Sequence, residues 1–395
     1  MDGGMIIMES ADAIVIGGGV IGTSIAYHLA ANRKVILLEK GDIGAQTSGA
    51  CDKAIFLQSK KADIAVELAR HSRKRFAYLE QELDAPIDFK PSGGMVVINK
   101  ESHLSFMKKY AKSRKKAGLK IDLLDQQETL ERQPCLSPNI LASTYCKEDA
   151  EVNPLLLTQA FTKAAKRRGA KIHTHTEVTD IICKNDRIEG VKSTKGRFAT
   201  KLVINAAGPY APIIAGMANV HLHMIPRRGV ILISEKIKPI VQGNVLCSDY
   251  LAAKHLSQQT KTELPPYGIG LSLGQTESGN LLIGSSREFK GYEKSIDHKL
   301  ISMIAAHASR IVPTLNFTRI IRSMVGFRPF IGDGLPIIDK IEEMEGFIIA
   351  TGHEGDGIAL APVTGELVEG LIDRDPSYQR WLTSLKLSRL QHTIT

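Results

Sequence analysis

The chain has 395 residues, 43% of them hydrophobic and 24% charged, as in ordinary globular proteins, and its formal net charge is +9. No apolar run approaches the roughly 20 residues that span a bilayer, and the first ten residues lack the basic and apolar regions of a secretory signal, so we expect a cytoplasmic protein. The five cysteines have no C-x-x-C spacing, which favours free thiols in a reducing compartment and argues against a zinc site or an iron–sulfur cluster within this chain.

The first motif is a glycine-rich turn between a strand and a helix. Residues 13–16 are apolar and predict a buried strand, and residues 24–30 predict a helix. Between them Gly17, Gly19 and Gly22 have the spacing G-x-G-x-x-G. The first glycine permits a tight turn, the second lets a pyrophosphate approach the backbone, and the third lets the helix pack against the strand. The helix N-terminus supplies N–H groups for the phosphates.

A second buried strand, residues 35–38, ends at an acidic residue, Glu39. A carboxylate at this distance from the glycines can accept hydrogen bonds from ribose hydroxyls, and it argues against a 2′-phosphate. The motif therefore predicts a site for FAD or NAD.

The middle of the chain changes from helices to strands. Residues 63–84 predict a helix by their apolar periodicity, and Asn153 followed by Pro154 is a strong helix-start signal. Alternation over residues 171–178 predicts a strand, and residues 201–209 predict another, buried strand that ends in small residues, among them Ala207 and Gly208. From 225 to 287 the pattern favours antiparallel strands, and residues 299–312 return to a helix.

A second glycine-rich loop lies near the end of the chain. Residues 346–350 predict a strand, residues 351–358 form the loop, and a helix is predicted through Leu360, Val363, Leu367 and Leu371. This arrangement predicts a second helix N-terminus that binds an anion, more than 300 residues from the first. A ligand held from both ends of the chain must be large, which favours FAD over a nicotinamide dinucleotide.

Much of the net positive charge lies in short runs, one in a predicted helix over residues 106–120 and another at residues 166–168. We interpret the basic residues of the first run as the face of a helix that is exposed to solvent. The alternative interpretation is a docking face for an acidic protein or an anionic membrane surface. Nucleic acid is disfavoured as a partner because no aromatic-interleaved binding module accompanies the charge.

These features together resemble the D-amino-acid oxidase-like family of FAD enzymes. The resemblance spans nearly the whole chain and rests on residues 13–39, 47–52 and 351–362 and on Arg328-Pro329. Similar members include glycine and sarcosine oxidases, the hydrogen cyanide synthase C subunit, and proline, hydroxyproline and opine dehydrogenases.

The resemblance implies an α/β fold in which a Rossmann-like FAD-binding domain is interleaved with a smaller, sheet-rich α+β substrate domain. We assign residues 11–86, 145–218 and 320–375 to the FAD-binding domain, 87–144 and 219–319 to the substrate domain, and 376–395 to a C-terminal tail.

By the resemblance, FAD is bound through both glycine-rich segments and the loop after Lys40. Members with covalent flavin have a cysteine close before the Arg-Pro stretch, and Gly326 stands at about that place here, so we expect non-covalent FAD. The expected cofactor-binding residues are Gly17, Gly18, Gly19, Val20, Gly22, Glu39, Lys40, Gln46, Thr47, Ser48, Gly49, Ala50, Val178, Ala207, Gly208, Gly352, His353, Gly355, Asp356, Gly357 and Ile358.

Arg328 matches the family arginine that pairs with the substrate carboxylate, and the alternative is a structural ion pair. Tyr250, Ser272 and His353 are further candidates for substrate contacts. The expected reaction removes a hydride from the carbon beside the nitrogen of an amino or imino acid, such as glycine, sarcosine, proline or hydroxyproline, and yields an imine. The similar members also imply companion subunits that carry an iron–sulfur electron acceptor.

Two other functions stay open from the sequence. A flavin-dependent dehydrogenase of a 2-hydroxy acid would use the same fold, with His353 as the base for the hydroxyl proton. A non-catalytic or RNA-modifying flavin-binding protein is supported only by the basic charge. The residues do not distinguish oxygen from another electron acceptor.

Overall fold

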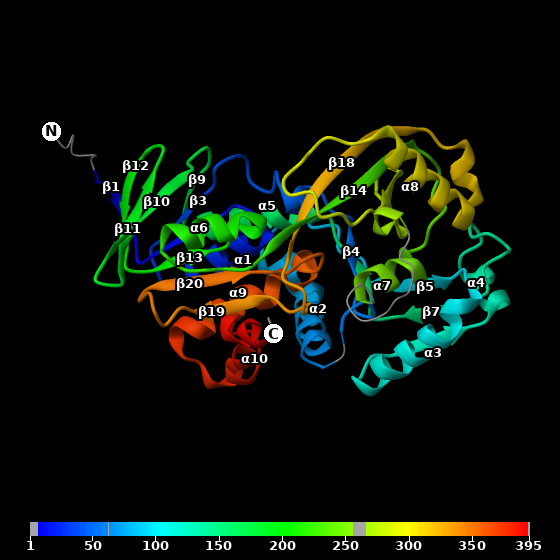
Figure 1. Cartoon of the computed structure of the whole chain (residues 1–395), viewed down its shortest axis with the longest axis horizontal. Coiled ribbons are helices and arrows are strands. Elements are labelled where there is room, and N and C mark those ends of the chain that lie inside the picture. The colour runs from blue at the N-terminus through cyan, green and yellow to red at the C-terminus, as the bar shows by residue number, and fades with distance from the viewer. Residues whose placement is uncertain (1–6, 62, 256–265, 394–395) are drawn as a thin grey trace.

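The computed structural model describes residues 7–61, 63–255 and 266–393, and its two largest sheets lie side by side (Figure 1). The first sheet is parallel except for the β19–β20 pair at its edge. Its strand order is β19 (Ile337–Lys340), β20 (Phe347–Thr351), β13 (Val203–Asn205), β2 (Ala13–Ile16), β3 (Val35–Leu38), β9 (Lys171–His173).

The central strands β2 and β3 are buried on both faces, which explains why they are continuous apolar runs. Ala13 and Val15 point into one core, and Ile14 and Ile16 point into another. The first core is completed by helices α1 (Val20–Leu29), α2 (Ile64–Glu82), α5 (Pro154–Arg167), α9 (Gly357–Asp373) and α10 (Gln379–Ser384). The second is completed by helix α6 (Ala211–Met217) and a four-stranded sheet of β1 (Ile7–Ser10), β12 (Gly196–Ala199), β11 (Arg187–Ser193) and β10 (Val178–Lys184).

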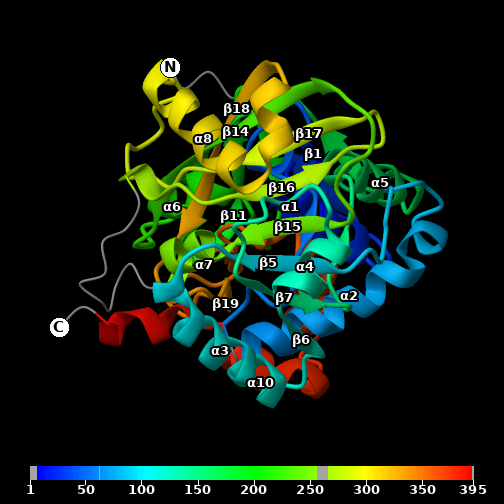
Figure 2. The same cartoon turned by 90° about the vertical axis from the view of Figure 1, so that its right-hand side faces the viewer.

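The second large sheet has eight strands and is antiparallel except for the parallel β15–β5 pair. Its order is β18 (Ile320–Phe330), β14 (Ile225–Lys236), β17 (Asn280–Gly284), β16 (Ser272–Gln275), β15 (Asn244–Cys247), β5 (Gly94–Ile98), β7 (Ala142–Cys146), β6 (Ile121–Leu124). Figure 2 shows this part from its outer side, with its helices α3 (Glu101–Lys116), α4 (Gln126–Arg132), α7 (Ser248–His255) and α8 (His298–Ile311). A short pair, β4 (Ala54–Ile55) with β8 (Ala150–Glu151), lies apart from both sheets.

The mixed α/β architecture confirms the predicted fold class. The domain boundaries stay a prediction. The eight-stranded sheet includes β18, which lies in a range that we assigned to the FAD-binding domain, and β7, which crosses the predicted boundary at residue 144. In the part of the chain that the structure describes, no helix is both long and apolar enough to cross a membrane.

Most predicted elements match observed ones within a few residues, including α2, α5, α8, β20 and α9. At α5, the Asn153 side chain accepts hydrogen bonds from the N–H groups of Leu155 and Leu156, both at 3.2 Å. The predicted strand over residues 171–178 is wrong in its second half. β9 ends at His173, because His175 has a φ of 49° in the left-handed region and turns the chain.

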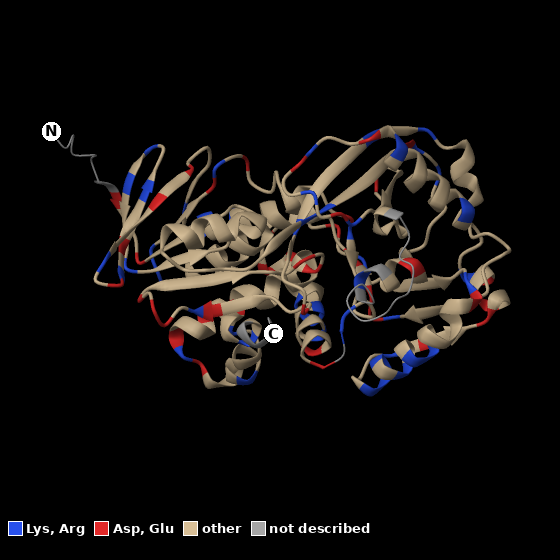
Figure 3. Cartoon of the chain, in the orientation of Figure 1, with Lys and Arg blue, Asp and Glu red and all other residues tan. Residues whose placement is uncertain are grey.

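Basic residues lie along much of α3 (Figure 3), and they differ in burial. The lysines of this helix from Lys108 to Lys116 are exposed, as expected for a solvated face. Arg114 instead is buried, lies over the Tyr110 ring and donates to the Lys60 carbonyl oxygen at 2.6 and 3.0 Å. Arg114 therefore ties α3 to the body of the protein.

Candidate active site

The glycine-rich turn after β2 has little space for side chains. Gly17 has a φ of +114°, and a Cβ there would lie 2.5 Å from the Ala206 carbonyl oxygen. A Cβ on Gly22 would lie 1.9 Å from the Gly17 carbonyl oxygen, so the start of α1 packs directly on the turn. Gly19 precedes α1 and offers no side-chain cap. This is the geometry that a pyrophosphate needs to approach a helix N-terminus.

The Glu39 carboxylate lies at the carboxyl end of β3, beside the glycine turn. It accepts hydrogen bonds from the N–H groups of Gly18 at 2.6 Å and Gly41 at 2.7 Å. Each carboxylate oxygen has a second lone pair, so Glu39 can still accept from two ribose hydroxyls. Lys40 follows, and its ammonium lies 3.5 Å above the Tyr210 ring.

The loop after Lys40 contacts both α1 and the eight-stranded sheet. The Ser48 hydroxyl accepts from the Val20 N–H at 3.0 Å, and the Thr47 hydroxyl donates to the Phe327 carbonyl oxygen at 2.7 Å. A Cβ on Gly326 of β18 would lie 2.8 Å from the Ala50 carbonyl oxygen. This loop is therefore held between the first motif and β18.

A cavity of about 1620 Å³, part of it open to solvent, joins these segments to the start of α9. Its wall contains the expected cofactor residues except Gly18, Gly22, Gly49, Gly352 and Asp356. The wall residues are Gly17, Gly19, Val20, Glu39, Lys40, Gln46, Thr47, Ser48, Ala50, Val178, Ala207, Gly208, His353, Gly355, Gly357 and Ile358. The glycine cradle, the free lone pairs of Glu39 and the two helix N-termini along one cavity fit FAD.

Arg328 lies at the other end of the cavity, on β18. Its Nη1 donates to the Ser286 carbonyl oxygen and its Nη2 to the Ser285 hydroxyl, each at 3.1 Å. The guanidinium lies across Gly229, where a Cβ would be 2.3 Å from Nη1. Among the residues that the structure describes, no carboxylate pairs with Arg328. Its remaining N–H groups can therefore bind a carboxylate of a small molecule.

The other three candidates differ in their positions. Tyr250 lines the cavity, whereas Ser272 does not. The Ser272 hydroxyl instead donates at 2.6 Å to Asp52, which lines the cavity. His353 lines the cavity but is buried, and its Nε2 lies 2.9 Å from the Thr364 hydroxyl oxygen. Burial lowers the pKa of His353 to about 3, so the imidazole is neutral.

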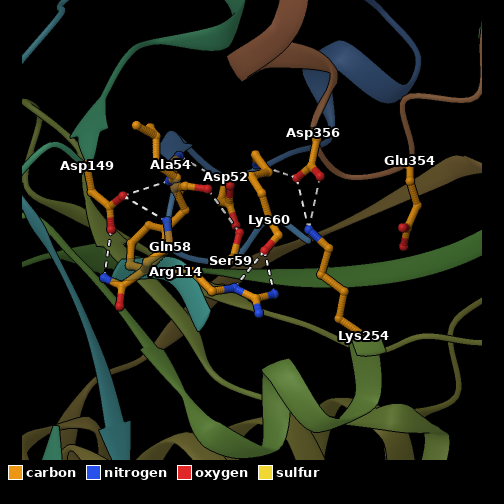
Figure 4. Close-up of polar contacts among 12 residues, drawn as sticks. Asp52, Ala54, Gln58, Ser59, Lys60, Arg114, Asp149, Lys254, Glu354 and Asp356 are labelled. Atoms are coloured by element: carbon orange, nitrogen blue, oxygen red, sulfur yellow. Dashed lines mark hydrogen bonds and ion pairs between the residues drawn. The ribbon is translucent and has the colours of Figure 1, made fainter. Parts of the chain in front are cut away.

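Asp356, immediately before α9, lies between two buried lysines (Figure 4). Lys60 lies 2.6 Å from its Oδ1, and Lys254 lies 3.0 and 3.1 Å from its two oxygens. Burial alone would raise the pKa of Asp356, but the two lysines bring it below its usual value. Burial lowers the pKa of Lys254 to about 8. Sequence reasoning missed both lysines, because no local pattern marks a lysine as buried.

A group of possible metal ligands lies away from the cavity. Cys247, Asp249 and His307 each place one such atom within 4.8 Å of the others. However, Lys100 lies 2.6 Å from Asp249, and the Leu271 N–H donates to the Cys247 sulfur at 3.0 Å. Two of the three side chains, Asp249 and Cys247, therefore have partners within the protein and do not require a metal ion.

The comparisons with known proteins agree with FAD as the cofactor. Residues 12–371 match the family model described as FAD dependent oxidoreductase, DAO. Glycine oxidase of Bacillus subtilis is 26% identical over 96% of this chain and 97% of its own, and hydrogen cyanide synthase subunit HcnC of Pseudomonas protegens is 26% identical over 92% and 93%. The crystal structure of L-proline dehydrogenase from P. horikoshii has a TM-score of 0.83 at 26% identity, covering 93% of this chain and 94% of that one. The chain belongs to the DAO family of FAD-dependent oxidoreductases.

Proposed function

We propose that this enzyme oxidises an amino or imino acid at the carbon beside the nitrogen and yields an imine. The observation that carries the proposal is the Arg328 guanidinium, which faces the cavity with no carboxylate partner among the described residues. Its Nε side lies beside Gly355, in the loop that leads to α9. The relatives named above, a glycine oxidase and a proline dehydrogenase, support the same substrate class.

Bound FAD would supply the hydride acceptor. Arg328 would hold the substrate carboxylate through a two-point contact and so fix the direction of the neighbouring C–H bond. The hydrogen of this C–H bond would leave carbon together with the bonding electron pair, as a hydride. The C–N bond would become a double bond, and the nitrogen would lose a proton to water. An amine that enters neutral needs no protein base for this step. Gly357 and Ile358 would present the α9 N-terminus to the flavin end of the cofactor.

The 2-hydroxy acid alternative is less well supported. That reaction requires a general base with a pKa near 7 to take the hydroxyl proton. His353 is buried, contacts the Thr364 hydroxyl and has a lowered pKa. In the described part of the cavity wall, His353 is the only histidine.

We further propose that the enzyme works with a companion subunit that carries an iron–sulfur electron acceptor. HcnC is itself named as a subunit of hydrogen cyanide synthase. The five cysteines of this chain are free and scattered, so the cluster would belong to the partner.

The test is the visible spectrum of the purified protein without oxygen. Glycine, sarcosine, L- and D-proline, hydroxyproline and 2-hydroxy acids are added in turn, and bleaching of the flavin by an amine supports the proposal. Bleaching by hydroxy acids alone would reject it in favour of the alternative. Reoxidation when air is admitted indicates an oxidase, and its absence indicates that the electron acceptor is a missing partner.

A further inference from the structure

Two arginines lie directly opposite each other on the sheet face that lines the cavity. Arg227 of β14 is the register partner of Arg328 of β18. Gly229 and Ile231 share the Arg227 side of β14, because side chains alternate along a strand, and both line the cavity. Opposed side chains in such a pair lie about 5 Å apart at Cβ, so two like charges here repel each other.

A third arginine, Arg287, reaches the same place from the segment after β17. Its guanidinium carbon lies 3.9 Å from the centroid of the Tyr250 ring, which lines the cavity. Its Nε and Nη1 are buried and make no hydrogen bond to any described residue. Burial lowers the pKa of Arg227, and the charges of Arg287 and Arg328 lower it further. Burial and the charge of Arg328 likewise lower the pKa of Arg287.

The carboxylates near this cluster do not balance its charge. Glu354 lines the cavity and pairs with Arg227. Asp356 is taken by Lys60 and Lys254. Arg287 and Arg328 are left without a carboxylate among the described residues. An uncompensated buried cation costs several kcal/mol, and natural proteins accept such a cost mainly where a ligand repays it.

We propose that the substrate is a dicarboxylic amino or imino acid, with one carboxylate on Arg328 and the second at Arg287, where Arg227 adds to the positive potential. The inference rests on the proposed function and narrows its substrate class. Arg328 positions the reacting carbon, and Arg287 selects substrates that carry a second negative charge. The Tyr250 ring, stacked on Arg287, orients the guanidinium.

The test compares achiral ligands that differ by one carboxylate. N-carboxymethylglycine and N-(2-carboxyethyl)glycine are compared with N-methylglycine and N-ethylglycine as substrates in anaerobic flavin reduction. Thiodiacetate and (methylthio)acetate, in which sulfur replaces nitrogen, are compared by their effect on the spectrum of the oxidised holoenzyme. We expect at least one dicarboxylate to reduce the flavin at least about tenfold more efficiently than its monocarboxylate counterpart. We also expect thiodiacetate to bind at least about tenfold more tightly than (methylthio)acetate.

Arg287→Met should reduce the preference for a dicarboxylate over its monocarboxylate counterpart, expressed as the ratio of reduction efficiencies or of affinities, by about tenfold. The reason is that the substitution removes the partner of the second carboxylate. Arg322→Met is the matched control, since Arg322 is an exposed arginine on β18 and its loss should leave the ratios unchanged. Arg287→Met should also unfold at the same or a higher temperature than the wild type, whereas a purely structural arginine would lower it.

The outcomes separate the two proposals. Monocarboxylates that match or exceed every dicarboxylate, or ratios that survive Arg287→Met, would overturn the dicarboxylate inference and leave the proposed function standing. If no amine bleaches the flavin, the proposed function is rejected. The thioether titration then decides separately whether Arg287 binds a second carboxylate.

Discussion

The Lys254 ammonium contacts both carboxylate oxygens of Asp356, at 3.0 and 3.1 Å. Lys254 belongs to α7, which packs on the eight-stranded sheet, and Asp356 precedes α9, which packs on the six-stranded sheet. Lys60 approaches the same carboxylate from a third segment. This contact therefore couples the two halves of the molecule at the helix N-terminus that we place against the flavin.

Asp356→Asn should lower the free energy of unfolding by about 3–5 kcal/mol, because it leaves two buried lysines without a carboxylate. The Lys60 and Lys254 side chains are only 3% and 8% exposed, so water cannot replace Asp356 well. The control is Asp180→Asn, which removes a surface pair with Lys192 and should cost at most about 1 kcal/mol. Urea unfolding measures both changes, and equal losses would contradict the buried-cluster argument.

Arg328→Ala should raise KM by about 100-fold while FAD stays bound, because the substrate loses a two-point charged contact but the cofactor does not. The measurement combines steady-state kinetics with the flavin-to-protein absorbance ratio. Arg322→Ala, on the same strand but exposed, should change neither. Loss of FAD with unchanged substrate affinity would show that Arg328 holds the cofactor instead.

Gly22→Ala should weaken FAD binding by at least about tenfold and destabilise the protein by about 1–3 kcal/mol. The reason is that its Cβ would lie 1.9 Å from the Gly17 carbonyl oxygen, which is backbone and cannot move aside cheaply. Gly216→Ala is the control, since Gly216 is also helical but exposed, with nothing within 4 Å of an added Cβ. It should be neutral or slightly stabilising. Equilibrium dialysis and thermal unfolding measure the two effects.

The parts of the site that sequence reasoning predicted are local in the chain. The order of strand, glycines, helix and Glu39 falls within 27 residues, so spacing alone carries its geometry. Arg227 was missed because its role depends on β14 and β18 lying in register, which no local pattern reveals. Arg287 was missed because it lies in the segment after β17, far from Arg227 in the sequence. The error at residues 171–178 has a related cause: a single residue, His175, adopts a left-handed conformation that alternation cannot signal.

Replacing His353 with Gln should make the stability of the protein less sensitive to acid. The folded-state pKa of His353 is lowered to about 3 from a usual 6.5, so below pH 6.5 the unfolded chain binds a proton that the folded one does not. This site therefore costs up to about 1.4 kcal/mol of stability per pH unit as pH falls from 6.5 towards 3. Urea unfolding at pH 7.5 and 5.5 should show a smaller loss for His353→Gln than for the wild type, and equal losses would mean that His353 can take up a proton when folded.

The flavin should be released intact when the protein is denatured by acid. The resemblance implies that the attachment cysteine of covalent members would stand close to Gly326, where a Cβ would already lie 2.8 Å from the Ala50 carbonyl oxygen. Cys51 does line the cavity, but its thiol donates to the Ser48 carbonyl oxygen at 3.0 Å, and burial raises its pKa, so it is a poor nucleophile. Precipitation with trichloroacetic acid should leave all yellow colour in the supernatant. A yellow pellet that becomes colourless in Cys51→Ala would instead identify that thiol as a covalent attachment point.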